Sequence, residues 1–171
     1  MNQETVLTKP QEPWIGSRGR IAVIIPSTNI GVEYDCQKLI PPGVSWHFCR
    51  FYIEQPDLSS DDLFMAFIEA IRHTIPDALR DAMTCEPSQI MMGMSAETFW
   101  GGLEGNTEFT ERLRDVVGHE IGITTGASAL DAALKVFGAK KIAALTPYQP
   151  IGDQQVHRFL EETGYEVTKV I

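Results

Sequence analysis

The sequence has little of three things: cysteine, positive charge and long apolar runs. Its three cysteines are Cys36, Cys49 and Cys85, which form neither an even-numbered disulfide framework nor a C-x-x-C spacing. This usage favours a reducing compartment, so we expect a cytoplasmic protein whose cysteines are structural. No apolar run approaches the roughly 20 residues that a membrane helix needs. The first residues, MNQETVLTKPQEPW, also lack the apolar core of a secretory signal.

Positive charge is outnumbered: 14 basic residues stand against 23 acidic ones, for a formal net charge of −9. A surface of this sign disfavours nucleic acid and anionic membranes as partners, so an anionic ligand has to be held by local groups. The four histidines share no metal-ligand spacing, and we expect no metal site; they are His47, His73, His119 and His157.

What the sequence does contain is an alternation of strand and helix patterns over 171 residues, 43% of them hydrophobic. Continuous or alternating apolar runs predict strands, and apolar residues at helical spacing predict helices. The clearest helix follows Ser60 as its N-cap, and Pro76 should kink it or split it in two. The expected strands are 20–25, 44–49, 89–92, 120–124, 141–146 and 165–171, and the expected helices are 61–79, 107–117, 128–137 and 153–163.

This alternation predicts an α/β fold with right-handed βαβ units and a parallel sheet. Ligands of such sheets bind at the carboxyl ends of the strands, where this sequence places short hydroxyl and amide side chains and almost no charge. Groups of this kind suit a pocket that holds carboxylate oxygens by hydrogen bonds. The segments concerned are 26–29, 93–95, 124–126 and 146–148.

The stretch MMGMSAETFWGG, residues 91–102, leaves a buried strand and turns polar. Gly93 to Glu97 can be compared with a G-x-S-x-G nucleophile elbow, with His119 or His157 as base, but Glu97 stands where the second glycine belongs. A serine hydrolase is therefore a minor alternative. We interpret the following GGLEGN as a flexible loop rather than a phosphate-binding loop, because its spacing matches neither common glycine motif. An acidic residue near a helix N-terminus is the expected explanation of Glu97.

Three segments together resemble a known family: IAVIIPSTNIGVEYD, MMGMSAETFWGG and ITTGASALDAALKVFGAKKIAALTPY. From about Arg20 to the last residue, the chain resembles the first two thirds of the aspartate/glutamate racemase superfamily. Within it, the similarity is to the branch of maleate cis-trans isomerases and arylmalonate decarboxylases. The resemblance implies two similar α/β lobes that hold a substrate carboxylate between them, without a cofactor. We expect a lead-in segment at 1–19, a first lobe at 20–126 and the start of an incomplete second lobe at 127–171.

The resemblance also implies a set of site residues. Gly93 falls at the position where isomerases carry the first of their two cysteines and where decarboxylases carry glycine. Met94 stands where a threonine donor is usual in the family. We expect the carboxylate donors implied by the family to be Asn29, Ser95 and Tyr148, with Thr125 as a further candidate that could equally cap a helix. The second cysteine would lie beyond Ile171, so the catalytic residues themselves stay unassigned.

These expectations combine into one functional hypothesis and one rival. The hypothesis is a protein that acts on a small dicarboxylic acid through an enolate-like intermediate, as an isomerase or a decarboxylase. The rival is a non-catalytic carboxylate-binding or regulatory domain with the same fold, which the absence of both family cysteines favours. The uncovered last strand and the family resemblance also favour association, so we expect a homodimer.

Overall fold

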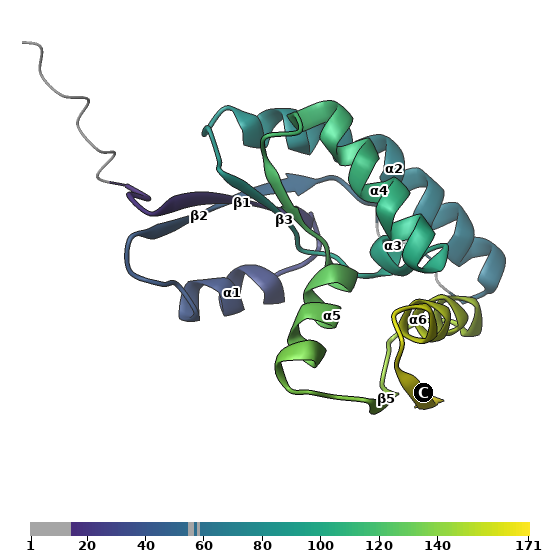
Figure 1. Cartoon of the computed structure of the whole chain (residues 1–171). Coiled ribbons are helices and arrows are strands. Elements are labelled where there is room, and N and C mark those ends of the chain that lie inside the picture. The colour runs from purple at the N-terminus through teal and green to yellow at the C-terminus, as the bar shows by residue number, and fades with distance from the viewer. Residues whose placement is uncertain (1–14, 55–56, 58) are drawn as a thin grey trace, which may run out of the picture.

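The structure of the chain is a computed structural model that describes residues 15–54, 57 and 59–171. Most of the expected lead-in, up to residue 14, lies outside the described residues. Strands and helices alternate along the described chain, as the sequence predicts (Figure 1). The elements are β1 Gly19–Pro26, α1 Gly31–Lys38, β2 Val44–Phe51, α2 Asp61–Met83, β3 Gln89–Met92, α3 Ala96–Phe99, α4 Gly102–Val117, β4 Gly122–Thr124, α5 Gly126–Val136, β5 Lys141–Ala144, α6 Pro150–Glu162 and β6 Glu166–Val170.

Four of the described strands form a parallel sheet in the order β2-β1-β3-β4. Figure 1 shows α2, α3 and α4 on one face of this sheet, and α1 and α5 on the other. Parallel neighbours joined through helices are βαβ units, so the predicted α/β class is confirmed. All strand carboxyl ends of this sheet therefore point to the same edge.

The main core lies between the sheet and helices α2 and α4. β1 is completely buried from Ala22 to Ile25, which explains why its sequence is apolar at every position. In α2, apolar residues recur at helical spacing and pack into this core, and Ser60 caps the helix by accepting a hydrogen bond from the Leu63 amide at 3.3 Å. The buried apolar residues of α2 are Phe64, Ile68, Ile71, Ile75, Ala78, Leu79 and Ala82.

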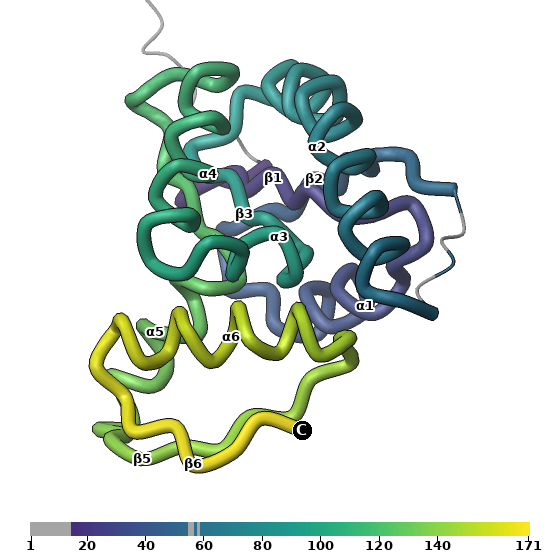
Figure 2. The backbone as a smooth tube through the Cα atoms, turned by 90° about the vertical axis from the view of Figure 1, so that its right-hand side faces the viewer, coloured from purple at the N-terminus to yellow at the C-terminus, as the bar shows by residue number. Residues whose placement is uncertain are grey.

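The last two described strands, β5 and β6, form a separate parallel pair. Helix α6 lies between this pair and helices α3 and α4, as Figure 2 shows from the side. A second core joins α6 to α3 and α5 through Phe99, Ala127, Phe159 and Leu160. The rings of Phe99 and Phe159 pack edge to face there, with centroids 5.3 Å apart. The boundary between lobes near residue 126 stays a prediction.

Three details differ from the sequence-based expectation. Helix α2 runs unbroken through Pro76, so the predicted split is wrong. The segment GGLEGN is not a loop, because Gly101 adopts a left-handed conformation at φ 78° and α4 begins at Gly102. The apolar spacing of residues 107–117 predicts that Val116 faces inward from α4 with Phe109 and Leu113, but Val116 is 42% exposed, and Val117 is buried in its place.

Two helices were not expected from the sequence, α1 and the four-residue α3. Among the residues of α1 only Cys36 is buried, so its sequence carries no apolar periodicity that would reveal it. None of the helices in the described part of the chain is long and apolar enough to cross a membrane.

Candidate functional site

A cavity of about 480 Å³ lies at the edge where the strands β1, β3 and β4 end. All six residues predicted to contact a substrate line it, and they come from the ends of β1, β3 and β4 and from the segment after β5. These residues are Asn29, Gly93, Met94, Ser95, Thr125 and Tyr148. Their role in binding stays a prediction. The rest of the described lining consists of Pro26, Val32, Phe67, Met91, Met92, Ala96, Thr124, Gly126 and Ala129.

Ser95 and Tyr148 are joined by a short hydrogen bond between their hydroxyl groups. Ser95 precedes α3 and Tyr148 follows β5, so this bond connects the two sheets across the mouth of the site. Burial raises the pKa of the Tyr148 phenol, with the Asp153 charge acting in the same direction and the Ser95 hydrogen bond against it. At neutral pH the phenol is therefore protonated and able to donate a hydrogen bond.

Asn29 is held in the turn between β1 and α1. Its side-chain oxygen accepts a hydrogen bond from the Val32 amide at 3.0 Å, and its backbone oxygen accepts one from Arg50 at 2.7 Å. The same arginine pairs with Glu33 at 2.5 Å, which ties the turn to β2. Since the Asn29 oxygen is occupied, the donor end of its amide is the part suited to an anionic ligand. The supporting role of Arg50 was not predicted.

Gly93 follows β3 with its backbone pressed against β1, where its amide donates to the Ile24 oxygen at 2.8 Å. A Cβ at this position would overlap the Cγ2 of Ile25 and lie 3.0 Å from the Cγ1 of Val32. Both neighbours are branched side chains, and Ile25 is fully buried. A side chain at this position would therefore force Ile25 or Val32 to move, which disfavours a thiol where the family resemblance implies one in the isomerases.

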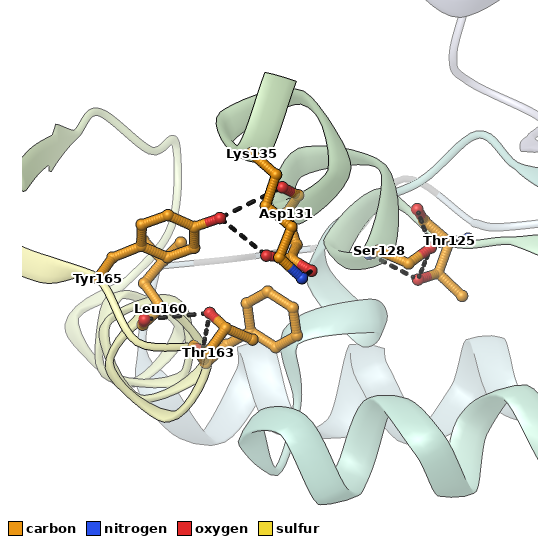
Figure 3. A network of polar contacts seen from close by, with 8 residues as sticks. Thr125, Ser128, Asp131, Lys135, Leu160, Thr163 and Tyr165 are labelled. Carbon is orange, nitrogen blue, oxygen red and sulfur yellow. Dashed lines mark hydrogen bonds and ion pairs between the residues drawn. The ribbon is translucent and has the colours of Figure 1, made fainter. Parts of the chain in front are cut away.

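Thr125 is buried, with 2% of its surface exposed, and it begins α5. Its hydroxyl oxygen accepts from the Ser128 amide at 3.1 Å while the Ser128 hydroxyl accepts from the Thr125 amide at 3.0 Å, the reciprocal pair of a capping box (Figure 3). The Thr125 hydroxyl hydrogen goes to the buried side-chain oxygen of Asn106 at 2.7 Å. Thr125 thus lines the cavity with a hydroxyl that the protein already engages, in agreement with its alternative role as a helix cap.

No charged side chain is among the described residues that line the cavity. Its polar groups are the side chains of Asn29, Ser95, Thr124, Thr125 and Tyr148, set among methionine, proline and aliphatic side chains and the ring of Phe67. Hydrogen bonds to an anion are stronger in such an apolar setting than in water. The arrangement can hold carboxylate oxygens beside an apolar group, as the strand-end residues predict.

The contacts of Glu97 differ from the helix N-terminal role predicted from the sequence. This residue is 1% exposed, and its carboxylate pairs with Arg72 and Arg112 rather than with the amides of a helix N-terminus. Burial raises the pKa of Glu97, and the two arginines oppose that shift. A buried carboxylate demands a partner, but the sequence does not show that Glu97 is buried or which residues pair with it.

The cysteines and histidines lie apart from the cavity. None of the cysteines is among the described lining residues, and burial raises the pKa of the thiols of Cys36, Cys49 and Cys85. A raised pKa keeps a thiol protonated and weakly nucleophilic. Within the described ranges, no three histidine, cysteine or acidic side chains are grouped so that they could hold a metal ion.

The hydrolase alternative gains no support from this geometry. The hydroxyl partner of Ser95 is Tyr148. His157 pairs with Glu161 on α6 at 3.3 Å, and His119 precedes β4, at the opposite edge of the sheet from Ser95.

Comparison with known proteins identifies similar chains. The maleate isomerase of Alcaligenes faecalis is 28% identical over an alignment of 156 residues, which covers 86% of this chain and 60% of that protein. The Nocardia farcinica maleate cis-trans isomerase, solved with a covalently bound succinylcysteine intermediate, matches with a TM-score of 0.76 and 21% identity over 89% of this chain and 62% of that one. Arylmalonate decarboxylase matches with a TM-score of 0.66 and 19% identity over 89% and 61%. No family model matches the chain.

The chain thus spans about three fifths of the length of these relatives. Its resemblance to maleate isomerases and arylmalonate decarboxylases is confirmed, by sequence for the first group and by fold for both. The predicted α/β architecture with a parallel sheet is the fold of these neighbours.

Proposed function

We propose that this chain forms the carboxylate-binding part of an active site that converts a small dicarboxylic acid, by isomerisation or decarboxylation, through an enolate-like intermediate. The observation that carries the proposal is the meeting of Asn29, Ser95 and Tyr148 at one uncharged cavity. The similarity to maleate isomerase and arylmalonate decarboxylase supports the substrate class. No cofactor is required in this proposal.

The chemistry follows from where negative charge would develop. When a malonate-type substrate loses one carboxylate as CO₂, the electron pair of the broken bond moves onto the remaining carboxylate as an enediolate. Preorganised donors at those oxygens stabilise the developing charge more than the substrate, which lowers the barrier. Ser95, Tyr148 and the Asn29 amide are the donors that would act on these oxygens, and the apolar wall with Phe67 and Met94 would contact a substituent on the α-carbon.

One observation favours a second candidate, a domain that binds a carboxylate without converting it. Among the described residues that line the cavity, Tyr148 is the single ionisable side chain, and its pKa is raised. Proton transfer by a positioned acid or base contributes roughly 10²–10⁴-fold to a rate, so a site without one would bind more effectively than it catalyses.

Incubation of the chain with maleate and with phenylmalonate, followed by proton NMR in D₂O, distinguishes the two candidates. Conversion, or exchange of the α-proton for deuterium, supports an enolate-forming enzyme. Saturable binding without either signal supports the binding domain, and the absence of binding with both acids contradicts the proposed site.

The assignment of the site is tested by two hydroxyl deletions, Ser95→Ala and Tyr148→Phe. Each removes a donor to an anionic ligand, so we expect each to raise the dissociation constant for malonate about tenfold, which corresponds to about 1.4 kcal/mol. Isothermal titration calorimetry measures this change. Ser88→Ala is the matched control, because that hydroxyl lies at the opposite edge of the sheet, before β3. Full affinity in Ser95→Ala would remove Ser95 from the site.

A further inference from the structure

Glu97 is a buried carboxylate that directly follows the lining residues Ser95 and Ala96 along the chain but does not line the cavity itself. Its two oxygens are held by Arg72 of α2 in a forked arrangement, with Nε 2.6 Å from Oε1 and Nη2 3.1 Å from Oε2. Arg112 of α4 adds a third contact at 3.4 Å. We call these three residues the Glu97 clamp. Burying a charge is costly unless partners compensate it, and here the two arginines supply those partners.

The clamp holds α3, the helix of four residues that directly follows Ser95. A helix this short cannot fix its own orientation, because it has barely one turn of hydrogen bonds. Glu97 anchors it to α2 and α4, and the buried Thr98 anchors it to α5 by accepting a hydrogen bond from the Ala127 amide at 3.1 Å. Three longer helices therefore set the direction of α3.

The same turn fixes Ser95. Its backbone oxygen accepts hydrogen bonds from the Thr98 amide at 2.9 Å and from the Thr98 hydroxyl at 2.7 Å. Ser95 is an exposed residue whose hydroxyl bonds Tyr148. The buried Thr98 therefore ties the backbone of Ser95 to the first turn of α3.

We propose that Glu97 is a positioning residue for the carboxylate site, which acts through Ser95 by holding α3 against Arg72 and Arg112. The clamp keeps the Ser95 hydroxyl beside Tyr148, where both hydroxyls can donate to one ligand that replaces the hydrogen bond between them. Because two guanidinium groups surround the Glu97 carboxylate, its negative charge is neutralised and does not repel an anion in the cavity. The inference rests on the proposed function, since it assigns a role in the same site.

A double-mutant cycle on malonate binding tests the proposal. Glu97→Gln keeps the shape of the side chain and removes its charge, and we expect it to weaken malonate binding about tenfold in the otherwise unchanged protein, but less than about twofold in a Ser95→Ala background. A residue that only stabilises the fold would weaken binding equally in both backgrounds. That result, or unchanged binding in Glu97→Gln alone, would overturn the proposal.

A measurement without ligand separates this inference from the proposed function. In protein labelled with ¹³Cζ-tyrosine, NMR follows the phenol titration of Tyr148, assigned with Tyr148→Phe. Ser95→Ala should raise the Tyr148 pKa, since the Ser95 hydrogen bond holds it down. In the Glu97→Gln background the same Ser95→Ala change should have no effect. An undiminished effect contradicts the positioning role, whereas malonate that binds to no variant contradicts the proposed function alone.

A second variant covers the case in which Glu97→Gln does not fold. Arg72→Lys keeps the positive charge and gives up the forked contact, and we expect about threefold weaker malonate binding, again lost in the Ser95→Ala background. Asp77→Asn is the control, because it removes an exposed ion pair with Arg80 on the same helix and should leave affinity unchanged. Unchanged affinity in Arg72→Lys would overturn the proposal.

Discussion

The backbone at Gly93 runs so close to β1 that a side chain there meets the branched groups of Ile25 and Val32. Replacement by alanine or cysteine overfills this buried position, and overpacking typically costs about 1–3 kcal/mol. We expect Gly93→Ala and Gly93→Cys to lower the midpoint of thermal unfolding by several degrees. Calorimetry with Gly31→Ala as control tests this, because the nearest atom to a Cβ at Gly31 is 4.0 Å away. Equal midpoints for the two alanine variants would show that Ile25 yields freely.

At the same scale, the lining residues of the site could be predicted from the sequence but their supports could not. Asn29 and Ser95 follow β1 and β3 of one parallel sheet, whose strand ends meet at the same edge, so their convergence follows from strand order. Tyr148 follows β5 of the separate pair, and only the family resemblance predicts it at the site. The contacts of Arg50 and Glu97 depend on how helices pack over that edge. No local pattern records a contact between residues 25 positions apart, such as Glu97 and Arg72.

At the scale of elements, α5 depends on its first turn. Thr125 supplies the cap of this helix and satisfies the buried oxygen of Asn106. Thr125→Ala would remove both contacts, and we expect it to lower the free energy of unfolding by about 2 kcal/mol, the sum of a lost cap and an unsatisfied buried acceptor. Urea denaturation measures the change. Thr125→Ser retains the hydroxyl and should lose at most about half as much free energy of unfolding as Thr125→Ala. If Thr125→Ala is as stable as the unchanged protein, the capping role is contradicted.

The elements themselves show where sequence patterns suffice. The strands and the longer helices were predicted because their apolar residues recur at strand or helix spacing, with at least part of one face packed against a core. Helix α1 buries only Cys36 among its residues and α3 has four residues, so neither carries a readable period. At Pro76 the sequence signals a break in the helix that the structure does not have. Ile75, before the proline, and Ala78, two residues after it, are packed into the core and keep the helix continuous.

At the scale of the whole molecule, Asp131 connects α5 to the β5 and β6 pair. Its carboxylate accepts hydrogen bonds from Tyr165 at 2.8 Å and from Lys135 at 2.6 Å, and the lysine is the main reason that the Asp131 pKa is lowered (Figure 3). A lowered pKa means that the unfolded chain binds the proton more readily, so this stabilisation is complete above a pH of about 4 and is lost as the pH falls further.

Asp131→Asn should therefore make the stability of the protein less sensitive to acid. We expect the free energy of unfolding to decline less between pH 5 and pH 2.5 in this variant than in the unchanged protein, as measured by urea denaturation at several pH values. Asp77→Asn, which removes an exposed acid with no buried partner, is the control. Parallel acid profiles for the unchanged protein and Asp131→Asn would contradict a lowered pKa at Asp131.

Association is the second prediction at this scale. Val136, Phe137 and Leu145 are each 85% exposed, at the end of α5 and after β5. Large exposed apolar groups favour contact with another surface, so we expect a homodimer, observed as twice the chain mass in size-exclusion chromatography with light scattering. Phe137→Glu should shift the population towards monomer. If the unchanged protein stays monomeric when its concentration in the measurement is raised 100-fold, the prediction is contradicted.

The hydrogen bond between Ser95 and Tyr148 joins residues 53 positions apart along the chain. Contacts of such separation form after the local ones, because the intervening chain must first be ordered. β1, β2, β3 and α2 all precede Tyr148 in synthesis and can assemble before it arrives. We therefore expect the pocket to be completed late in folding, when the segment after β5 reaches a sheet edge that is already in place.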